Sequence, residues 1–386
     1  MMEVVRMRFS NRVFFGPGSA AKLEEESRAL GAKHALVVTD KGIREAGLLD
    51  HALEPLRAAG AEAEVYDDVP PEPPIEALEK CFDVYRKQKF DLVVGIGGGS
   101  PLDVAKSMSV LLTNKGEVRD YLGTDLVPKP GTPSIMIPTT AGTGAEATPN
   151  AIFSIEEEKV KKAIVSSHVI ADVAILDPAL TLGLPPKQTA ASGVDALTHC
   201  LETYVALNAT PISEMFSLEG MRLISRSVRS AVHNGRDLEA RADMLLGSYY
   251  GGVCLAGASA GAIHALSYPL SGRRHVPHGI GNAMLFPHVM EFNYVSDLNK
   301  FAVIAETLGE DVDGLSVREA AEVSVDAVRT LCEDVGVPTT LRELDIDASA
   351  IPELAEAAAR ITRILDFNPR RMTKEDIIGV YERAAG

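Results

Sequence analysis

Residues 92–106 read LVVGIGGGSPLDVAK, an apolar run followed by three glycines, a serine and a proline. Proline is well tolerated at the first position of a helix, where no backbone donor is lost, and serine is a good cap. The stretch therefore predicts a buried strand, a tight turn and a helix that begins near Pro101. It is not the GxGxxG fingerprint of the ordinary dinucleotide-binding turn.

The three glycines allow two interpretations. Glycine lets a backbone approach a phosphate closely, and a helix N-terminus offers free N–H groups and a positive dipole end. The turn is then a pyrophosphate cradle formed by Gly97, Gly98, Gly99 and Ser100. A tight turn without a ligand satisfies the same sequence equally well, so the stretch alone leaves both interpretations open.

Three further apolar runs surround this unit, and helical patterns alternate with them. The runs are Ala35–Thr39, Ala63–Tyr66 and Ser134–Ile137, and the helical patterns cover residues 19–30, 42–59, 74–88 and 101–113. The first three runs of the chain start about 30 residues apart, which is enough for a strand, a crossover helix and two loops. This alternation predicts a mainly parallel sheet covered by helices on both faces.

The pattern changes after Asp177, where PALTLGLPPKQT is rich in proline and glycine. Beyond it long helical patterns dominate, at residues 186–207, 211–234, 317–335 and 373–385. A chain of 386 residues suits two domains of about 100–200 residues each. We therefore expect an α/β nucleotide-binding domain over residues 1–185 and an all-α domain over residues 186–386.

Charge and cysteine content limit the partners and the compartment. The formal net charge of −16 disfavours nucleic acid and anionic membrane surfaces as partners. Four widely spaced cysteines without a CxxC pair indicate reduced thiols, and the N-terminal residues lack the long apolar core of a signal peptide, so a cytoplasmic location is expected. Residues 244–272 carry no charge, but their glycines, alanines and His264 favour a buried helix or helix pair over a membrane span.

Two more segments of the first domain suit contacts with a nucleotide. Asp40 follows a predicted strand, where a carboxylate can accept hydrogen bonds from a ribose diol and repel a 2′-phosphate. Residues 138–150, PTTAGTGAEATPN, concentrate hydroxyls and glycines after another predicted strand. From position alone, a surface helix cap is the commoner role for Asp40, and an ordinary polar loop explains residues 138–150 equally well.

One carboxylate and three imidazoles form the clearest chemical pattern of the second domain. Asp195 and His199 stand four residues apart, on one face of a predicted helix. His264 lies in the uncharged stretch, and two prolines and a glycine break the chain before His278, which lets the second histidine return towards the first. This donor set suits Fe²⁺ or Zn²⁺ with a position left open for substrate. For the Asp195–His199 pair taken alone, a salt bridge or a satisfied core histidine is the commoner explanation.

Five stretches of the chain resemble the iron-containing (group III) alcohol dehydrogenase family. They are GIGGGSPLDVAK (95–106), PTTAGTGAEAT (138–148), DPALTLGLPP (177–186), ASGVDALTHCLETY (191–204) and HALSYPLSGRRHVPHGIGNAMLFPHVMEFN (264–293), in the order of the family. The resemblance implies a dehydroquinate synthase-like α/β domain that binds the nucleotide, an all-α domain that binds the metal, and an active site between them. Family members commonly use Fe²⁺, sometimes Zn²⁺, and often form dimers.

The resemblance also implies roles for individual residues. The family's metal ligands fall on Asp195, His199, His264 and His278. Its cofactor contacts fall on Asp40, Gly98, Gly99, Ser100, Thr139, Thr140, Thr148, Lys162, Leu180 and Gly183, to which we add Gly97, Asp103 and Thr143 from the same stretches. The expected cofactor is NAD rather than NADP.

The chain departs from the family at two positions. Members often carry histidine four residues after the third ligand, where this chain has Tyr268, and an ordinary tyrosine pKa of about 10 makes proton relay there doubtful. Tyr268 and His275 are nevertheless the candidate catalytic groups. The family's frequent asparagine in the loop after the second apolar run is Glu72 here, and a carboxylate beside NAD disfavours NADP further.

These features predict a metal-dependent, NAD-linked dehydrogenase that interconverts a small alcohol, diol or hydroxy acid and its aldehyde or ketone. Alternatives are a hydroxyacid–oxoacid transhydrogenase, a dehydroquinate-synthase-like lyase, and a metal or nucleotide sensor without turnover. The stretch SYPLSG (267–272) looks closer to the transhydrogenase branch of the family. Arg273 and Arg274 favour an anionic substrate if either points towards the metal, whereas surface ion pairs are the more common arrangement. The expected partners are a small substrate and a second copy of the chain.

Overall fold

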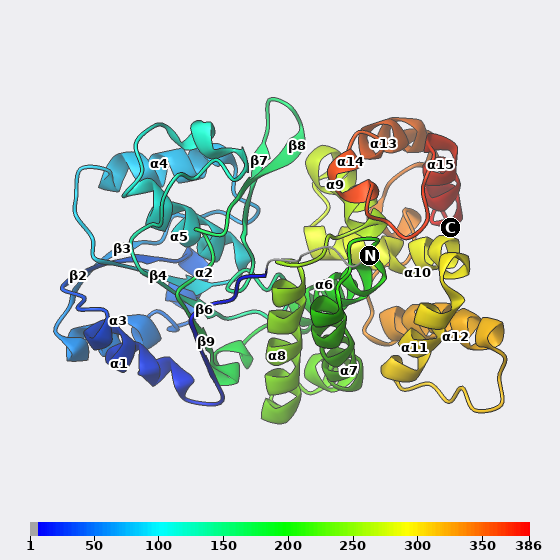
Figure 1. Ribbon diagram of the computed structural model, residues 1–386, viewed down its shortest axis with the longest axis horizontal. Coiled ribbons are helices and arrows are strands. Elements are labelled where there is room, and N and C mark those ends of the chain that lie inside the picture. The colour runs from blue at the N-terminus through cyan, green and yellow to red at the C-terminus, as the bar shows by residue number, and fades with distance from the viewer. Residues whose placement is uncertain (1–6) are drawn as a thin grey trace. The chain divides into compact units, whose positions relative to one another are not determined.

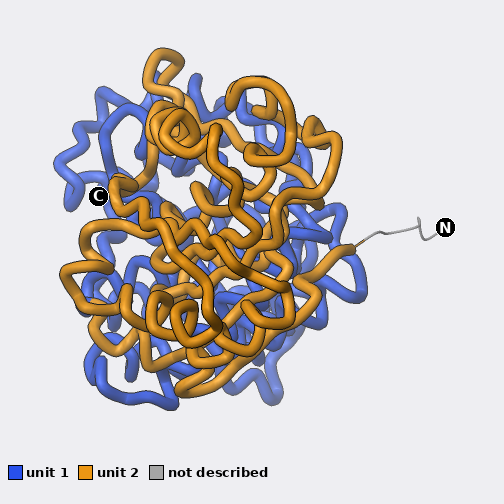
Figure 2. Tube along the Cα trace, turned by 90° about the vertical axis from the view of Figure 1, so that its left-hand side faces the viewer, with its two compact units in different colours: residues 1–6, 185–386 blue, residues 7–184 orange. Residues whose placement is uncertain are grey.

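The computed structural model describes residues 7–386, which divide into two units, residues 7–184 and residues 185–386 (Figure 2). The division falls one residue before the boundary expected from the sequence. Pro185 and Pro186 explain its position, because neither can donate a backbone hydrogen bond and the second occupies the first position of a long helix. The prediction that the chain carries no signal peptide rests partly on residues 1–6, which lie outside the described residues.

A six-stranded parallel sheet forms the centre of residues 7–184 and confirms the predicted α/β class (Figure 1). In spatial order its strands are β1 (Arg12–Phe15), β9 (Val173–Leu176), β6 (Ser134–Pro138), β4 (Leu92–Gly97), β2 (His34–Val38) and β3 (Glu62–Tyr66). The chain adds β3 on one side of β2 and β4 on the other, so the strand order reverses there. The carboxyl ends of strands at such a reversal form the usual ligand crevice of an open parallel sheet.

Helices cover both faces of this sheet: α1 (Lys22–Ala29) and α3 (Asp50–Ala59) on one face, α4 (Ile75–Tyr85) and α5 (Gly99–Leu111) on the other. Alternate residues of β2 enter opposite cores, since Val37 packs in the core of α1 and α3 whereas Leu36 packs in the core of α4 and α5. With both faces buried, the strand reads as a continuous apolar run.

Several short elements escape the sequence patterns. They are β1, β9, and a second sheet of β5 (Gly123–Thr124), β8 (Val160–Val165) and β7 (Asn150–Ile155), together with the 3-10 helices η2 (Val118–Tyr121) and η3 (Pro178–Thr181). The helical pattern of residues 42–59 forms two helices, α2 (Lys41–Glu45) and α3, and that of residues 19–30 begins with the 3-10 helix η1 (Ser19–Ala21). β7 and β8 form an antiparallel hairpin in which buried and more exposed residues alternate. Short strands of this kind carry a weaker apolar signal than strands buried on both faces.

Residues 185–386 are helical, and no strand occurs within this range. The helices are α6 (Pro186–Val205), α7 (Pro211–His233), α8 (Leu238–Cys254), α9 (Ala262–Arg274), α10 (His278–Asn293), α11 (Leu298–Leu308), α12 (Val317–Asp334), α13 (Ile351–Ala358), α14 (Thr362–Leu365) and α15 (Lys374–Arg383), with 3-10 turns η4 (Tyr294–Ser296), η5 (Arg342–Leu344) and η6 (Ala348–Ala350). α6 packs against α7, α8, α9 and α10, which gives it a largely buried surface.

The uncharged stretch, residues 244–272, forms the second half of α8 and most of α9. Both segments are largely buried within the helical unit, as expected for closely packed small residues. Among residues 7–386 no helix combines the length and the hydropathy that a membrane crossing requires.

A buried ionic cluster lies behind the loop that follows β6. Lys106 is fully buried, and its Nζ donates to Thr148 Oγ1 at 3.0 Å and pairs with Asp103 at 3.2 Å. Glu146 is 1% exposed, and its Oε1 has no hydrogen-bond partner among the described residues. Burial raises the pKa of Glu146 from 4.5 to about 7, although the charge of Lys106 acts in the opposite direction. The folded chain therefore holds this proton more tightly than the unfolded chain.

We expect Glu146 to make the protein less stable as the pH rises from about 4.5 to about 7. A carboxyl pKa that is higher in the folded state gives no penalty below this window and the full penalty, about 3 kcal/mol, above it. Urea unfolding measures the decrease in unfolding free energy from pH 5 to pH 8. This decrease should be about 2–3 kcal/mol smaller for Glu146→Gln than for wild type. The exposed Glu157→Gln serves as control and should follow wild type. Identical pH dependence in Glu146→Gln and wild type contradicts the prediction.

Candidate functional site

Three helices bring the four candidate metal ligands together. Asp195 and His199 lie on α6, His264 on α9 and His278 on α10. His264 Nε2 is 3.0 Å from His199 Nε2 and 3.8 Å from Asp195 Oδ1, and His278 Nε2 is also 3.8 Å from Asp195 Oδ1. Three of the four side chains are buried, and His278 is partly buried. The donor atoms of Asp195, His199 and His264 therefore lie within 4.8 Å of one another inside the helical unit, and His278 approaches this group at Asp195.

A sharp break between α9 and α10 returns His278 to His264. α9 ends at His275, whose φ of 55° is in the left-handed region, and Pro277 precedes the first residue of α10. In an uninterrupted helix the two imidazoles, fourteen residues apart, would be separated by about 21 Å. The predicted role of the chain break agrees with this geometry.

The spacing of the donors fits a tetrahedrally coordinated divalent metal. With bonds of about 2.0–2.1 Å, neighbouring ligand atoms of such a site are about 3.4 Å apart. The separations here, 3.0 and 3.8 Å, bracket that value. Burial alone raises the pKa of Asp195, but the three imidazoles and a hydrogen bond from Asn282 outweigh it and hold the pKa below its ordinary value. An ionised carboxylate beside three imidazoles is a donor set for Fe²⁺ or Zn²⁺.

Glu202 orients one of these ligands and was not among the residues predicted from the sequence. Its Oε2 lies 2.5 Å from Nδ1 of His264, and its Oε1 accepts from the backbone N–H of Ile263 at 2.6 Å. Because Glu202 accepts the Nδ1 proton, the Nε2 lone pair of His264 is directed at the other donors. A signal was present: Glu202 follows His199 by three residues, on the same helix face.

Asn282 is a second residue that the sequence analysis missed. It lies four residues after His278 on α10 and is fully buried. Its Nδ2 is 2.6 Å from Asp195 Oδ1, 3.2 Å from His264 Nε2 and 3.3 Å from His278 Nε2. An amide has only two N–H groups, and the shortest of these contacts makes the Asp195 carboxylate the principal acceptor. Asn282 therefore holds Asp195 in place within the cluster.

In the other unit, the glycine-rich turn lies at the carboxyl end of β4, at the reversal of strand order. α5 begins at Gly99, two residues before the expected start, and Ser100 accepts a hydrogen bond from the backbone of Glu72 instead of capping the helix. Gly97 has a φ of 145°, and a Cβ there would lie 2.5 Å from Pro101 Cγ. A Cβ at Gly99 would lie 2.7 Å from Thr143 Cγ2. Only glycine fits at these two positions.

Other predicted cofactor residues surround this turn. Asp40 follows β2 and caps α2, its Oδ1 accepting from Ile43 N at 2.9 Å, and its Oδ2 would lie 3.5 Å from a Cβ at Gly97. Thr140, from the loop after β6, is within 3.6 Å of the corresponding position at Gly98, and the Thr139 amide donates to Gly97 O at 2.9 Å. The structure thus groups Asp40, Gly97, Gly98, Gly99, Ser100, Thr139, Thr140 and Thr143 at one edge of the sheet.

Five predicted cofactor residues have other surroundings. Asp103 pairs with Lys106 at 3.2 Å and accepts from Ile152 N at 2.9 Å, and Thr148 accepts from Lys106. Lys162 is exposed on β8 and pairs with Glu158 at 2.6 Å. The other two follow β9: Leu180 is buried in η3, and Gly183 has open space beside it. Asp103 and Thr148 thus both contact the buried Lys106 and support the end of the loop formed by residues 138–150.

The two candidate catalytic residues differ in position. The Tyr268 ring centroid lies 5.7 Å from that of His278 and 6.4 Å from that of His264. Burial raises the pKa of Tyr268, so its phenol keeps the proton at neutral pH. His275 is exposed at the end of α9. Tyr268 therefore lies beside the ligand cluster with its phenol protonated, and His275 lies at the surface.

Arg273 and Arg274 both pair with Glu353 of α13, at 2.5 and 3.0 Å. These are the ion pairs that the sequence allowed as the commoner alternative. Both guanidinium groups are directed at α13 and not at the ligand cluster, so they give no support to an anionic substrate.

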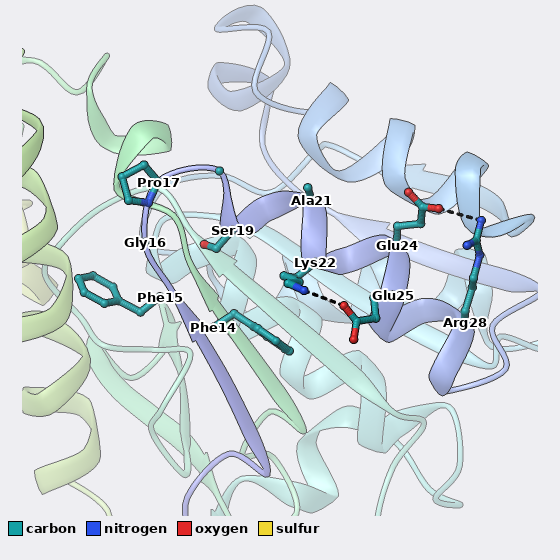
Figure 3. A pocket seen from close by; sticks show the side chains of 11 residues that line it. Phe14, Phe15, Gly16, Pro17, Ser19, Ala21, Lys22, Glu24, Glu25 and Arg28 are labelled. Atoms are coloured by element: carbon teal, nitrogen blue, oxygen red, sulfur yellow. Dashed lines mark hydrogen bonds and ion pairs between the residues drawn. The ribbon is translucent and has the colours of Figure 1, made fainter.

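A groove of about 640 Å³ lies elsewhere, in residues 7–184, where β1, η1 and α1 line it (Figure 3). Its rim carries the ion pairs Lys22–Glu25 and Arg28–Glu24. No candidate cofactor or metal residue lines it, so it is a separate feature of the surface.

We expect Glu202→Gln to weaken metal binding by about 10–100-fold, because an amide accepts the Nδ1 proton of His264 less strongly than a carboxylate. Competition with a chromogenic chelator measures the metal Kd directly, without an activity assay. Glu219→Gln, an exposed position on α7, is the matched control and should bind metal like wild type. An unchanged metal Kd in Glu202→Gln rules out this role.

Comparisons with known proteins agree with this geometry. The profile of "Iron-containing alcohol dehydrogenase" matches residues 10–178, and that of "Fe-containing alcohol dehydrogenase family, C-terminal" matches residues 189–385. The chain is 44% identical to long-chain-alcohol dehydrogenase 1 of Geobacillus thermodenitrificans, over 99% of this chain and 97% of that protein. It is 36% identical to the NAD-dependent methanol dehydrogenase of Bacillus methanolicus, over 96% and 97% of the two chains.

A solved structure of 1,3-propanediol oxidoreductase has the same fold, with a TM-score of 0.96 and 37% identity over 99% of this chain and 100% of that one. The two family profiles, the relatives and the shared fold cover both units. The chain therefore belongs to the iron-containing alcohol dehydrogenase family.

Proposed function

We propose that this protein is a metal-dependent, NAD-linked alcohol dehydrogenase that interconverts a small alcohol or diol and its aldehyde or ketone. The observation that carries the proposal is the grouping of Asp195, His199 and His264, whose donor atoms lie within 4.8 Å of one another, with His278 Nε2 3.8 Å from Asp195 Oδ1. The names of the relatives, which act on a long-chain alcohol, methanol and propanediol, support the reaction class. Fe²⁺ is the first choice of metal within this family, and Zn²⁺ suits the same donors.

Each residue near the cluster has a distinct task in this proposal. When bound, the metal supplies Lewis acidity towards an alcohol oxygen and NAD supplies the hydride acceptor. Asp195 contributes the negative charge and the histidines contribute neutral nitrogen, while Glu202 and Asn282 keep these groups in position. Tyr268 retains its phenolic proton and can donate a hydrogen bond beside His278. A catalytic role for His275 has less support because its side chain is exposed.

NAD is the proposed cofactor, bound at the glycine-rich turn. Asp40 lies at the carboxyl end of β2, where its carboxylate can accept from the ribose hydroxyls and repels a 2′-phosphate. Glu72 contributes less to this selectivity than the sequence alone implies, because Lys161 neutralises its charge in an ion pair of 3.0 Å. The name of the Bacillus methanolicus relative is further support for NAD.

The proposed compartment is the cytoplasm, and the proposed assembly is a homodimer. Four buried free cysteines suit a reducing compartment. The dimer proposal rests on β1, an edge strand of the large sheet: its Val13 and Phe15 are 40% and 45% exposed, and the preceding Phe9 is 38% exposed. An edge strand with exposed apolar side chains is a template for pairing with another strand. The same strand of a second copy can pair with it about a twofold axis, and the groove beside β1 leaves room for the partner.

We expect metal removal by an anaerobic chelator to abolish NAD-linked oxidation of C2–C6 alcohols and diols, and Fe²⁺ or Zn²⁺ to restore it. His199→Ala should bind substoichiometric metal and lose at least about 100-fold in kcat/KM. His233→Ala, an exposed histidine on α7, is the control and should keep both properties. Wild-type turnover in His199→Ala refutes the proposal. Hydride exchange between a hydroxy acid and an oxo acid without added NAD indicates the transhydrogenase instead.

We expect the pair Val13→Lys and Phe15→Lys to convert a dimer into the 41.2 kDa monomer, since charges on both copies repel across the paired strands. Light scattering after gel filtration measures the mass. Val84→Lys changes a 53% exposed valine on α4 and should remain dimeric. A monomeric wild type, or a double variant that stays dimeric, excludes this interface.

A further inference from the structure

The helix that carries the candidate ligand His264, α9, begins without a cap of its own. Its N-cap residue is Gly261, which has no side chain to accept hydrogen bonds from the free N–H groups of the first turn. A Cβ at this position would lie 3.1 Å from Asn368 Oδ1 and 3.2 Å from Glu202 Oε1. A serine or aspartate cap would therefore crowd two buried oxygens, and the acceptors come from other elements instead.

Two buried side chains accept from this first turn. Glu202 of α6 accepts from Ile263 N at 2.6 Å, and Asn368, which follows α14, accepts from Ala262 N at 3.2 Å. Both side chains are almost completely buried. The two N–H groups that they satisfy belong to the two residues before His264. The position of that imidazole therefore depends on both acceptors.

Asn368 is itself held by a reciprocal pair of amide hydrogen bonds with Asn293, the last residue of α10. Asn293 Nδ2 donates to Asn368 Oδ1 at 3.0 Å, and Asn368 Nδ2 donates to Asn293 Oδ1 at 2.8 Å. Asn368 Nδ2 also donates to the carbonyl of Arg370 at 2.6 Å. Because both amide protons and the oxygen of Asn368 are paired, its side chain has one orientation.

The same asparagine connects the helices that carry two of the candidate ligands. His264 is the third residue of α9, and His278 is the first residue of α10. Asn368 contacts the first residue of α9 and the last residue of α10, so it fixes one helix against the other. Metal–ligand distances hold within about 0.2 Å. A small shift of α9 is therefore enough to move His264 Nε2 out of a coordinating position.

Glu202 makes this connection specific for the metal ligand. Its Oε2 lies 2.5 Å from His264 Nδ1, while its Oε1 accepts from Ile263 N. One carboxylate thus aligns both the imidazole and the backbone of the first turn. When α9 loses its contact with Asn368, the first turn is free to move relative to Glu202, and the imidazole loses its alignment.

We propose that Asn368 is a positioning residue for the metal site: it caps α9 from the C-terminal segment and thereby holds His264 against Glu202. The inference rests on the proposed function, because it takes the ligand cluster to bind a divalent metal. No periodicity in the sequence indicates this contact, since Asn368 lies 106 residues after Ala262.

The test measures the Zn²⁺ Kd by competition with a chromogenic chelator, and the d–d absorption spectrum of the Co²⁺-loaded protein. Asn368→Ala should raise the Zn²⁺ Kd about tenfold, because it removes the acceptor of Ala262 N without replacing a ligand. Its Co²⁺ spectrum should differ from that of wild type, since a displaced imidazole alters the ligand field. Asn114→Ala is the matched control: it removes a buried asparagine with three hydrogen bonds in the other unit. It should lower Tm but leave the Zn²⁺ Kd within about twofold of wild type.

A double-mutant cycle with Glu202→Gln distinguishes positioning from a purely structural role. Because Asn368 acts through Glu202, the Zn²⁺ Kd of the double variant should rise by less than the product of the two single effects. Single effects that multiply in full overturn the inference. So does a folded Asn368→Ala that binds Zn²⁺ like wild type.

Gly261→Ala tests the same connection if Asn368→Ala does not fold. The added methyl group displaces the oxygens of Asn368 and Glu202 by a few tenths of an ångström, without removing either side chain. It should raise the Zn²⁺ Kd severalfold and change the Co²⁺ spectrum. Wild-type values for both contradict the proposed position of Asn368.

The wild-type protein separates this inference from the proposed function. A wild type that binds no metal refutes the metal-dependent activity and the inference with it. A wild type that binds Zn²⁺, combined with Asn368→Ala of equal affinity and an unchanged Co²⁺ spectrum, refutes the inference alone.

Discussion

The burial of Asp195, His199 and His264 with donor atoms within 4.8 Å of one another, and with His278 Nε2 3.8 Å from Asp195 Oδ1, is the constraint on which the helical unit depends. Four donors with lone pairs directed at one volume are costly to bury unless hydrogen bonds or a cation compensate them. Glu202 fixes the proton of His264, and Asn282 donates to Asp195. These two contacts leave the remaining lone pairs directed inwards, which is the arrangement that a divalent metal requires.

The packing of the helices follows from this requirement. α6 is buried along most of its length, and α8, α9 and α10 pack around it. α9 and α10 must be separate helices, because only a sharp turn brings His278 back to His264. The left-handed backbone of His275 and the ring of Pro277 provide that turn, so their exposed position is consistent with a role in the fold.

The candidate cofactor site of the α/β unit is formed by backbone and supported by buried charged groups, whereas the candidate metal site of the helical unit is formed by side chains. Gly97 and Gly99 allow the chain to turn where any side chain would collide. Lys106 holds the end of the loop formed by residues 138–150 through Thr148. Glu72 and Lys161 connect the glycine-rich turn to the β7–β8 hairpin. An acidic protein can bind an anionic dinucleotide in this way because helix dipoles and paired lysines act locally, whereas the net charge acts over longer distances and is screened by salt.

The sequence by itself determined the fold class, because β2, β3, β4 and β6 are apolar runs spaced for crossover helices. It also predicted the candidate donor set, because Asp195 and His199 share one helix face and a chain break separates His264 from His278. β1, β9 and the β7–β8 hairpin were not predictable, since they are short or alternate in burial. Only the tertiary structure decided which polar groups meet across elements: Glu202 with His264, Asn282 with Asp195, and Lys161 with Glu72. It also turned Asp103 towards Lys106 and Lys162 towards Glu158. Periodicity reports the face on which a side chain lies, but its partner depends on the packing of elements far apart in the chain.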